Sequence, residues 1–225
     1  MTVHVVNTVP ESINTRARIP YASFVSAKKT EQTMVGIDVS RFQGEIDFEK
    51  VREAGCEFVI MRIGGYDDGA VYVDRYYEQN LQNARAAGLK IGIYYHAEER
   101  TATEVRRHVQ WLLKVLDGEP LDFPIAYDWE DYTHFEDYGI NFSDLNQLYE
   151  AFDAALNEAG YETMLYGSKS YLESIWAPSA ATHTVWLAHY TSSTSYAGKY
   201  ILWQRDNVGQ IPGVEGDVDL DVYYP

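Results

Sequence analysis

Two carboxylates in residues 126–130 are spaced for acid–base chemistry. Asp128 and Glu130 close the run AYDWE and occupy alternate positions. Residues two apart in a strand share a face, about 6.5–7 Å apart along the chain. In a partly dry site such groups resist simultaneous ionisation, so one pKa rises. Glycosidic cleavage needs this inequality, with one acid to protonate the leaving oxygen and one carboxylate to stabilise developing positive charge. The alternative is that either residue caps a helix or lines solvent, since an isolated Asp-x-Glu is a weak signal.

Further carboxylates fall where strands are expected to end. Asp38 lies in GIDVS, where an Asx turn or a helix cap is the alternative role for this residue type. Asp217, Asp219 and Asp221 alternate along one strand near the C-terminus and share a face. They could form a solvated acidic edge or a calcium site, although the glycine and the terminal glutamate of an EF-hand loop are missing. We expect no metal ion and no cofactor.

Signatures of other functional classes are missing from the sequence. It contains no G-x-S-x-G, H-E-x-x-H, P-loop or C-x-x-C pattern. The six histidines lack the spacing of metal ligands. The single cysteine, Cys56, is interpreted as a small core residue. The net charge of −16 argues against nucleic acid as a partner, because phosphate binding needs clustered lysine and arginine.

A regular alternation of strands and helices must position the carboxylates. Apolar runs predict strands at residues 34–39, 57–63, 90–96, 123–129, 162–167, 184–190, 199–204 and 217–223. Helix-like stretches cover residues 47–55, 76–87, 104–116 and 143–159, the last with Ser143 as its expected N-cap. This order implies a parallel sheet with right-handed crossovers.

The last three expected strands leave little room for helices between them. Eight strands in about 190 residues are also short for a full (β/α)8 barrel. We therefore expect a TIM-like α/β barrel whose final part is helix-poor and antiparallel in places. An open doubly wound sheet is the alternative, although no G-x-G-x-x-G follows the first strand. In a parallel barrel, functional residues gather at the C-terminal strand ends, where these carboxylates fall.

Residues 1–34 differ from the rest of the chain. Pro10 and Pro20 interrupt them, and AKKTEQT ends the segment as a polar linker. We expect an N-terminal arm or extension outside a barrel domain of residues 35–225, either disordered or packed against the domain or a partner. The segment lacks a basic region followed by an apolar one, so no classical secretory signal is expected. The chain has no run of 18 apolar residues, so no membrane span is expected.

Seven short motifs, in order, resemble those of the family 25 glycoside hydrolases, the Chalaropsis-type lysozymes of bacteria, fungi and phages. They are GIDVS-x-x-QG at residues 36–44, IMR at 60–62, GIYYH at 92–96, DWE at 128–130, WLAHY at 186–190, WQ at 203–204 and VDLD at 218–221. The likeness covers about residues 35–224. It implies a (β/α)5(β)3 barrel and hydrolysis of the β-1,4 bond between N-acetylmuramic acid and N-acetylglucosamine in bacterial peptidoglycan, with retention.

The resemblance also implies roles for individual residues. It places Glu130 as the proton donor, Asp128 as the charge that stabilises the intermediate, and Asp38 and Asp219 as supporting carboxylates. Attack by Asp128 and attack by the substrate's own 2-acetamido group both remain open. The residues expected to contact the sugars, from the strand ends and motifs, are Tyr66, Tyr94, His96, Tyr166, Trp186, Tyr190 and Gln204. The sequence departs from the family pattern at GGYDDG, residues 64–69, and at AEE, residues 97–99.

Two other functions stay open at this point. The chain could be a cell-wall glycan-binding module with weak catalysis, or a barrel glycosidase acting on chitin, which shares the N-acetyl group. The resemblance favours action outside the cell or in the cell wall, after delivery by a phage or release without a classical signal peptide. A partner chain or a targeting module could bind through residues 1–34.

Overall fold

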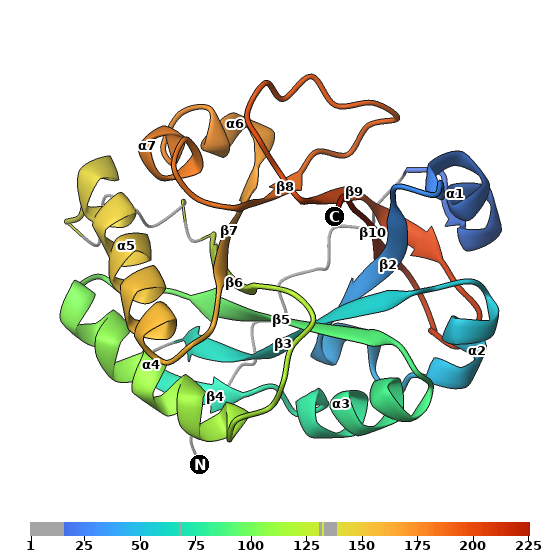
Figure 1. Cartoon of the computed structure of the whole chain (residues 1–225), viewed down its shortest axis with the longest axis horizontal. Helices are drawn as coiled ribbons and strands as arrows, with labels where there is room; N and C mark the ends of the chain where they lie inside the picture. Colours follow the sequence, from blue (N-terminus) through green and yellow to red (C-terminus); the bar gives the residue numbers. More distant parts are fainter. Residues whose placement is uncertain (1–15, 68, 131, 133–138) are drawn as a thin grey trace, which may run out of the picture.

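Eight strands close into a barrel in the computed structural model, which describes residues 16–67, 69–130, 132 and 139–225 (Figure 1). They are β2 (Met34–Val39), β3 (Phe58–Asp67), β5 (Lys90–Ala97), β6 (Ile125–Trp129), β7 (Thr163–Ser168), β8 (Val185–Ala188), β9 (Leu202–Gln210) and β10 (Val218–Tyr223). They pair in the order β9-β10-β2-β3-β5-β6-β7-β8, and pairing of β8 with β9 closes the ring. Strand β10 is antiparallel to both of its neighbours, whereas the other pairs in the ring are parallel.

Helices follow the first five barrel strands. They are α2 (Phe48–Glu53), α3 (Tyr77–Ala86), α4 (Ala102–Leu116), α5 (Phe142–Glu158) and the short pair α6 (Lys169–Leu172) and α7 (Ala177–Ala180). A 3-10 turn, η1 (Arg41–Gln43), follows β2, and residues 185–223 contain no helix. The predicted TIM-like (β/α)5(β)3 barrel is therefore confirmed. Among the described residues, every helix is too short or too polar to traverse a lipid bilayer.

One helix start differs from the prediction. Asn141, not Ser143, caps α5, because its Oδ1 accepts hydrogen bonds from the backbone N–H groups of Ser143 at 2.8 Å and Asp144 at 3.1 Å. An asparagine side chain at this position satisfies amides that would otherwise have no partner at the helix start.

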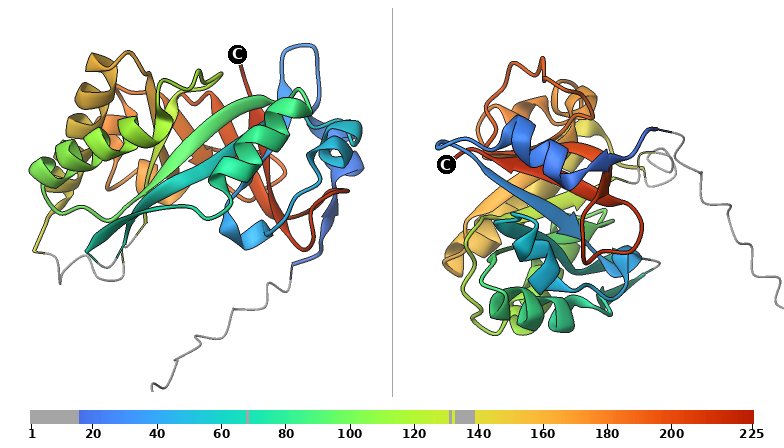
Figure 2. Two further views of the ribbon diagram at one scale, coloured as in Figure 1. Left: turned by 90° about the horizontal axis from the view of Figure 1, so that it is seen from below. Right: turned by 90° about the vertical axis from the view of Figure 1, so that its right-hand side faces the viewer.

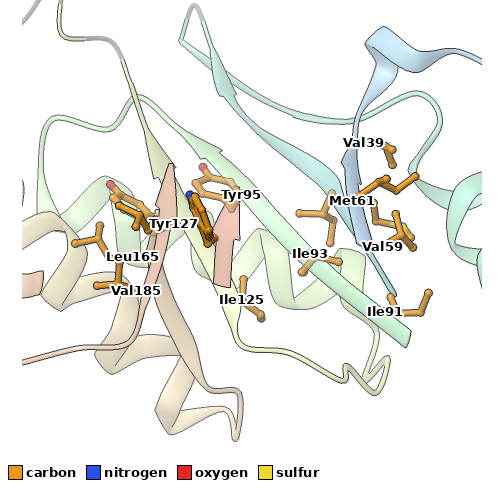
Figure 3. Close-up of a cluster of buried hydrophobic side chains, with 14 of the residues drawn as sticks. Val39, Val59, Met61, Ile91, Ile93, Tyr95, Ile125, Tyr127, Leu165 and Val185 are labelled. Atoms are coloured by element: carbon orange, nitrogen blue, oxygen red, sulfur yellow. The ribbon is translucent and has the colours of Figure 1, made fainter. Parts of the chain in front are cut away.

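Alternate strand residues build two separate hydrophobic clusters. Residues such as Val59, Ile93 and Tyr127 pack outward against the helices (Figure 3). Their neighbours in the sequence belong to a second cluster, which includes Phe58, Ile60, Ala126, Met164, Trp186 and Leu202. Because side chains alternate along a strand, the second set fills the barrel interior. The same alternation directs Asp38, Asp128 and Gln204 inward above that filling.

Residues 16–34 pack against the barrel. Strand β1 (Ile19–Pro20) pairs in parallel with β9, and α1 (Tyr21–Lys28) follows it, beside β9 and β10 (Figure 2). Tyr21 and Phe24 are buried in the same cluster as the outward-facing strand residues. Residues 1–15, the rest of the expected arm, lie outside the described residues.

A hairpin extends β3 beyond the barrel wall. Strand β4 (Ala70–Val73) pairs antiparallel with the end of β3, with Gly64 opposite Val73. Gly64 has φ 149°, and a Cβ atom there would lie 2.0 Å from the Tyr72 carbonyl oxygen. Only glycine permits this approach, which leads the chain toward Asp74.

Candidate active site

The predicted carboxylates gather at the open end of the barrel. Asp38 lies near the end of β2, Asp128 lies near the end of β6, and Glu130 follows β6. Because β10 runs antiparallel to β2, Asp219 near its start pairs in register with Asp38. All four line a cleft of about 180 Å³, together with Tyr94, Tyr166, Trp186, Tyr190 and Gln204.

A larger hollow adjoins this cleft. It measures about 530 Å³ and shares Glu130, Tyr166 and Tyr190 with the cleft. The rest of its lining comes from the end of β7, the α6 segment that follows it and the end of β8 with the next residue, namely Ser168, Lys169, Ser170, Glu173, Ala188 and His189. The side chain of Glu130 is exposed, whereas Asp128 is buried. Glu130 therefore stands where the two hollows meet, within reach of a ligand that spans both.

Aromatic rings line the same region. Trp186 lies 4.8 Å from Tyr166 and 6.1 Å from Tyr94 between ring centroids. Trp186 and Tyr166 are buried, so these rings pack against one another and form the wall beside the carboxylates.

Burial and mutual repulsion set the protonation of the cleft. Burial raises the pKa of Asp128 well above its usual range, and the charges of Glu130 and Asp38 raise it further. Burial also raises the pKa of Glu130, because protein atoms crowd the carboxyl even though it reaches solvent. Interacting acids such as these titrate as a pair. The pair therefore keeps a proton to higher pH than isolated carboxyls do, as acid–base chemistry requires.

Gln204 links the aromatic wall to the carboxylates. Its Oε1 accepts hydrogen bonds from the hydroxyls of Tyr166 at 2.8 Å and Tyr190 at 2.9 Å. Its amide nitrogen is thereby turned toward Asp38 and donates to Oδ2 of that residue at 2.7 Å. The sequence predicted Gln204 as a sugar contact, but the structure gives it this bridging position as well.

Arg62 is a residue of the site that sequence reasoning missed. Its guanidinium is buried and bound to Asp74 at 2.8 Å. Its charge lowers the pKa of Asp128 and so opposes the effect of burial. Its inward position on β3, two residues after Ile60, could have signalled this, because an arginine there must face the barrel opening.

Two predicted sugar contacts lie elsewhere. Within the described part of the chain, Tyr66 and His96 are not among the residues that line either hollow. The Tyr66 ring packs at a tilt against the His108 ring of α4, with 4.4 Å between ring centroids, and His108 Nδ1 lies 2.8 Å from Glu99 Oε1. His96 lies beside Asp128 in the register of β5 and β6. No group of three metal-ligating side chains is arranged for a metal ion among the described residues.

Comparison with known proteins adds the family. The sequence model of the glycosyl hydrolases family 25 matches residues 37–214, more than half of the chain. The chain belongs to glycosyl hydrolases family 25. The matched part of this family 25 protein includes Asp38, Asp128 and Glu130. Asp219 lies beyond it and joins the site through the pairing of β10 with β2.

Relatives of this family 25 protein have low sequence identity, but the similarity extends over most of the chain. It is 26% identical over 191 residues to the autolytic lysozyme of Clostridium acetobutylicum, covering 84% of this chain and 56% of that protein. The chain thus spans little more than half of that relative's length.

Solved structures share the barrel. The spore cortex lytic enzyme SleM of Clostridium perfringens superposes with a TM-score of 0.76 at 20% identity, covering 88% of this chain and 68% of that one. A family 25 glycosyl hydrolase of Bacillus anthracis gives a TM-score of 0.70 at 19% identity, covering 88% and 92%. At these identities the likeness shows the fold.

Proposed function

We propose that this protein is a muramidase, which hydrolyses the β-1,4 bond between N-acetylmuramic acid and N-acetylglucosamine in bacterial peptidoglycan with retention. The observation that carries the proposal is the position of Glu130, exposed at the meeting point of two hollows with buried Asp128 beside it. The family match and the relatedness to an autolytic lysozyme support the choice of peptidoglycan. Action on the cell wall, outside the cytoplasm, is part of the proposal.

Glu130 acts first as the acid. Its carboxyl proton passes to the glycosidic oxygen as the bond from that oxygen to C1 breaks, and the leaving sugar departs with a hydroxyl group. Positive charge develops at C1 beside Asp128. Either the Asp128 carboxylate or the substrate's own 2-acetamido oxygen then closes on C1, with Asp128 orienting the acetamido group in the second case. Asp38 and Asp219 line the same cleft as supporting carboxyls, and Asp38 accepts the hydrogen bond from Gln204.

Water completes the reaction. Glu130, now ionised, takes a proton from a water molecule as the water oxygen bonds to C1 from the side that the leaving group vacated, and the bond from C1 to Asp128 or to the acetamido oxygen breaks. The acid is thereby restored and the configuration at C1 is retained. Tyr94, Tyr166, Trp186, Tyr190 and Gln204 are proposed to hold the sugars. Tyr66 and His96 would contact substrate only beyond the cleft.

Product analysis tests this function. Purified sacculi are digested, the fragments are reduced with borohydride, and their ends are identified by mass spectrometry. We expect fragments that end in reduced N-acetylmuramic acid. Fragments ending in reduced N-acetylglucosamine would reject the proposed bond. Binding to sacculi without fragments would indicate a binding module, and cleavage of chitin oligomers alone would indicate a chitinase.

A further inference from the structure

Asp221 is a fully buried carboxyl group that the proposed reaction does not use. It lies on β10 opposite Gly36, two residues after Asp219, which is opposite Asp38. Because side chains alternate along a strand, Asp221 shares the inward face with Asp219 but lies deeper in the barrel. A carboxyl in such a place needs hydrogen-bond partners, since unpaired buried charge is costly.

One oxygen of Asp221 has an ordinary partner. The indole N–H of Trp186 donates to Oδ1 at 2.9 Å. The other oxygen, Oδ2, is buried, and no N–H or O–H donor of another described side chain reaches it. The carboxyl of Asp38 is a neighbour of Asp221, because both side chains point inward from the paired strands β2 and β10, and Gln204, which binds Asp38, lies opposite Asp221 on β9. Two carboxyl groups can form a hydrogen bond only when one of them carries a proton.

Asp38 is held so that it can share this proton. Its Oδ2 accepts the amide N–H of Gln204 at 2.7 Å, and the two tyrosine hydroxyls on Gln204 Oε1 fix the direction of that amide. Because Oδ2 of Asp38 already accepts a hydrogen bond from Gln204, a proton bound to this pair of carboxyls would lie between Asp38 and Asp221. Burial raises the pKa of both carboxyls above the usual range, so the pair keeps a proton at neutral pH.

The charged and titratable groups around the pair are mostly acids or neutral phenols. They are Arg62 on β3, Tyr94 on β5, Asp128 on β6, Glu130 after β6, Tyr166 on β7, Tyr190 after β8, Asp206 on β9, Asp219 on β10, Tyr21 on α1, and Cys56 before β3. The cation of this set, Arg62, is already bound to Asp74. A proton is therefore what relieves the repulsion between Asp38 and Asp221.

We propose that Asp221 is a positioning residue, which shares one proton with Asp38 and keeps the negative charge of the pair on the deep side, away from Asp128 and Glu130. This inference rests on the proposed glycosidase function. It makes Asp38 a neutral, oriented carboxyl at the cleft rather than a third anion beside the acid–base pair.

Asp221→Asn tests the shared proton. The Trp186 N–H requires the amide oxygen, so the amide nitrogen must point at Asp38 and donate to it. Asp38 then ionises, and its charge moves next to Asp128 and Glu130. We expect the acid limb of the pH profile of kcat/KM on peptidoglycan to move up by about one pH unit, as a nearby like charge raises a carboxyl pKa.

Asp217→Asn is the matched control, since it removes the same charge from a surface residue that binds Arg18 at 2.8 Å. Its profile should stay with that of the wild type. If the wild type is active and the pH profile of Asp221→Asn matches those of Asp217→Asn and the wild type, this inference is overturned while the proposed function stays intact. A wild type that cuts no peptidoglycan would reject the function instead.

Infrared spectroscopy gives a readout that does not depend on activity or on folding of Asp221→Asn. At pH 7 the wild type should show a protonated carboxyl band that is lost in Asp38→Asn and kept in Asp217→Asn. A wild-type spectrum with no band that depends on Asp38 would overturn the shared proton.

Discussion

Gln204 holds Asp38 by a hydrogen bond of 2.7 Å between Nε2 and Oδ2, across 166 residues of sequence. The two residues lie on β9 and β2, which β10 separates in the barrel wall. Both side chains point inward, and the barrel closure brings them together. Asp38, which the resemblance to the family predicts to be a supporting carboxylate, is thus oriented by the side-chain amide of Gln204 from the helix-poor end of the barrel.

Gln204→Leu should lower both stability and activity. It leaves the buried Tyr166 hydroxyl without its acceptor and buried Asp38 without its donor, which costs about 1–3 kcal/mol for each buried group left unpaired, whereas exposed Tyr190 can bond to water. Tyr190→Phe is the control, because it removes one donor and leaves the Gln204–Asp38 bond intact. Chemical denaturation and kcat/KM measure the effects. Equal stability of the leucine variant and the wild type would contradict the bridging role.

Glu130→Gln should reduce cleavage of peptidoglycan by about 10²–10⁴-fold, because an amide cannot donate the proton that the leaving oxygen needs. The side chain is exposed, so folding should persist. Glu53→Gln, on the exposed surface of α2, is the matched control. Release of reducing ends is the measurement, and a variant rate near that of the wild type would reject Glu130 as the acid.

Arg62→Met should destabilise the protein by about 3–5 kcal/mol, because it leaves the buried Asp74 carboxylate without its cationic partner and with only backbone N–H donors. The double variant Arg62→Met/Asp74→Asn should recover part of this loss. Both variants should also move the acid limb of the pH–rate profile upward, since the cation that lowers the pKa of Asp128 is gone. An unmoved profile in the stable double variant would show that Arg62 serves only Asp74.

The cleft acids should make stability fall as pH rises. Their folded-state pKa values are raised, so the folded protein binds protons more tightly than the unfolded chain above about pH 4. Their stabilising contribution is therefore complete below about pH 4, and it is lost as the pH rises through their raised folded-state pKa values.

Asp219→Asn should accordingly unfold at higher denaturant concentration than the wild type at pH 7, with the gap closing toward pH 4. Activity should fall in the same variant. Glu53→Gln, on the exposed surface of α2, should show no such trend. A constant gap at all pH values would contradict linkage to the Asp219 proton.

Phe24→Ala should lower the unfolding free energy by about 3–5 kcal/mol, because Phe24 of α1 is only 2% exposed in the main core. Phe42→Ala provides the matched control, since Phe42 is 69% exposed and its loss should change stability by about 0.5 kcal/mol or less. Thermal unfolding measures both. Equal melting temperatures would show that α1 is not part of the folding unit.

The barrel was predictable because its signals are local. Apolar runs and helix stops marked the eight barrel strands and helices α2 to α5, and the shortage of residues between the last strands indicated the helix-poor end. The short elements β1, β4, α1, α6 and α7 were not predicted. The cap of α5 was misassigned because Ser143 and Asn141 are both good N-cap residues, and backbone conformation chooses between them. The packing of α1 stayed open in the sequence, since its buried residues, Tyr21 and Phe24, are too few to show a helical period.

By itself, the sequence determined the strands, their inward alternation and the placing of Asp38, Asp128 and Glu130 at strand ends, because these follow from periods of two and 3.6 residues along the chain. Only the tertiary structure decided that Gln204 orients Asp38, that Arg62 balances Asp128, and that Asp221 lies beneath the cleft. Those relationships depend on which strands become neighbours when the barrel closes, and on burial that strengthens charges only after water has been excluded.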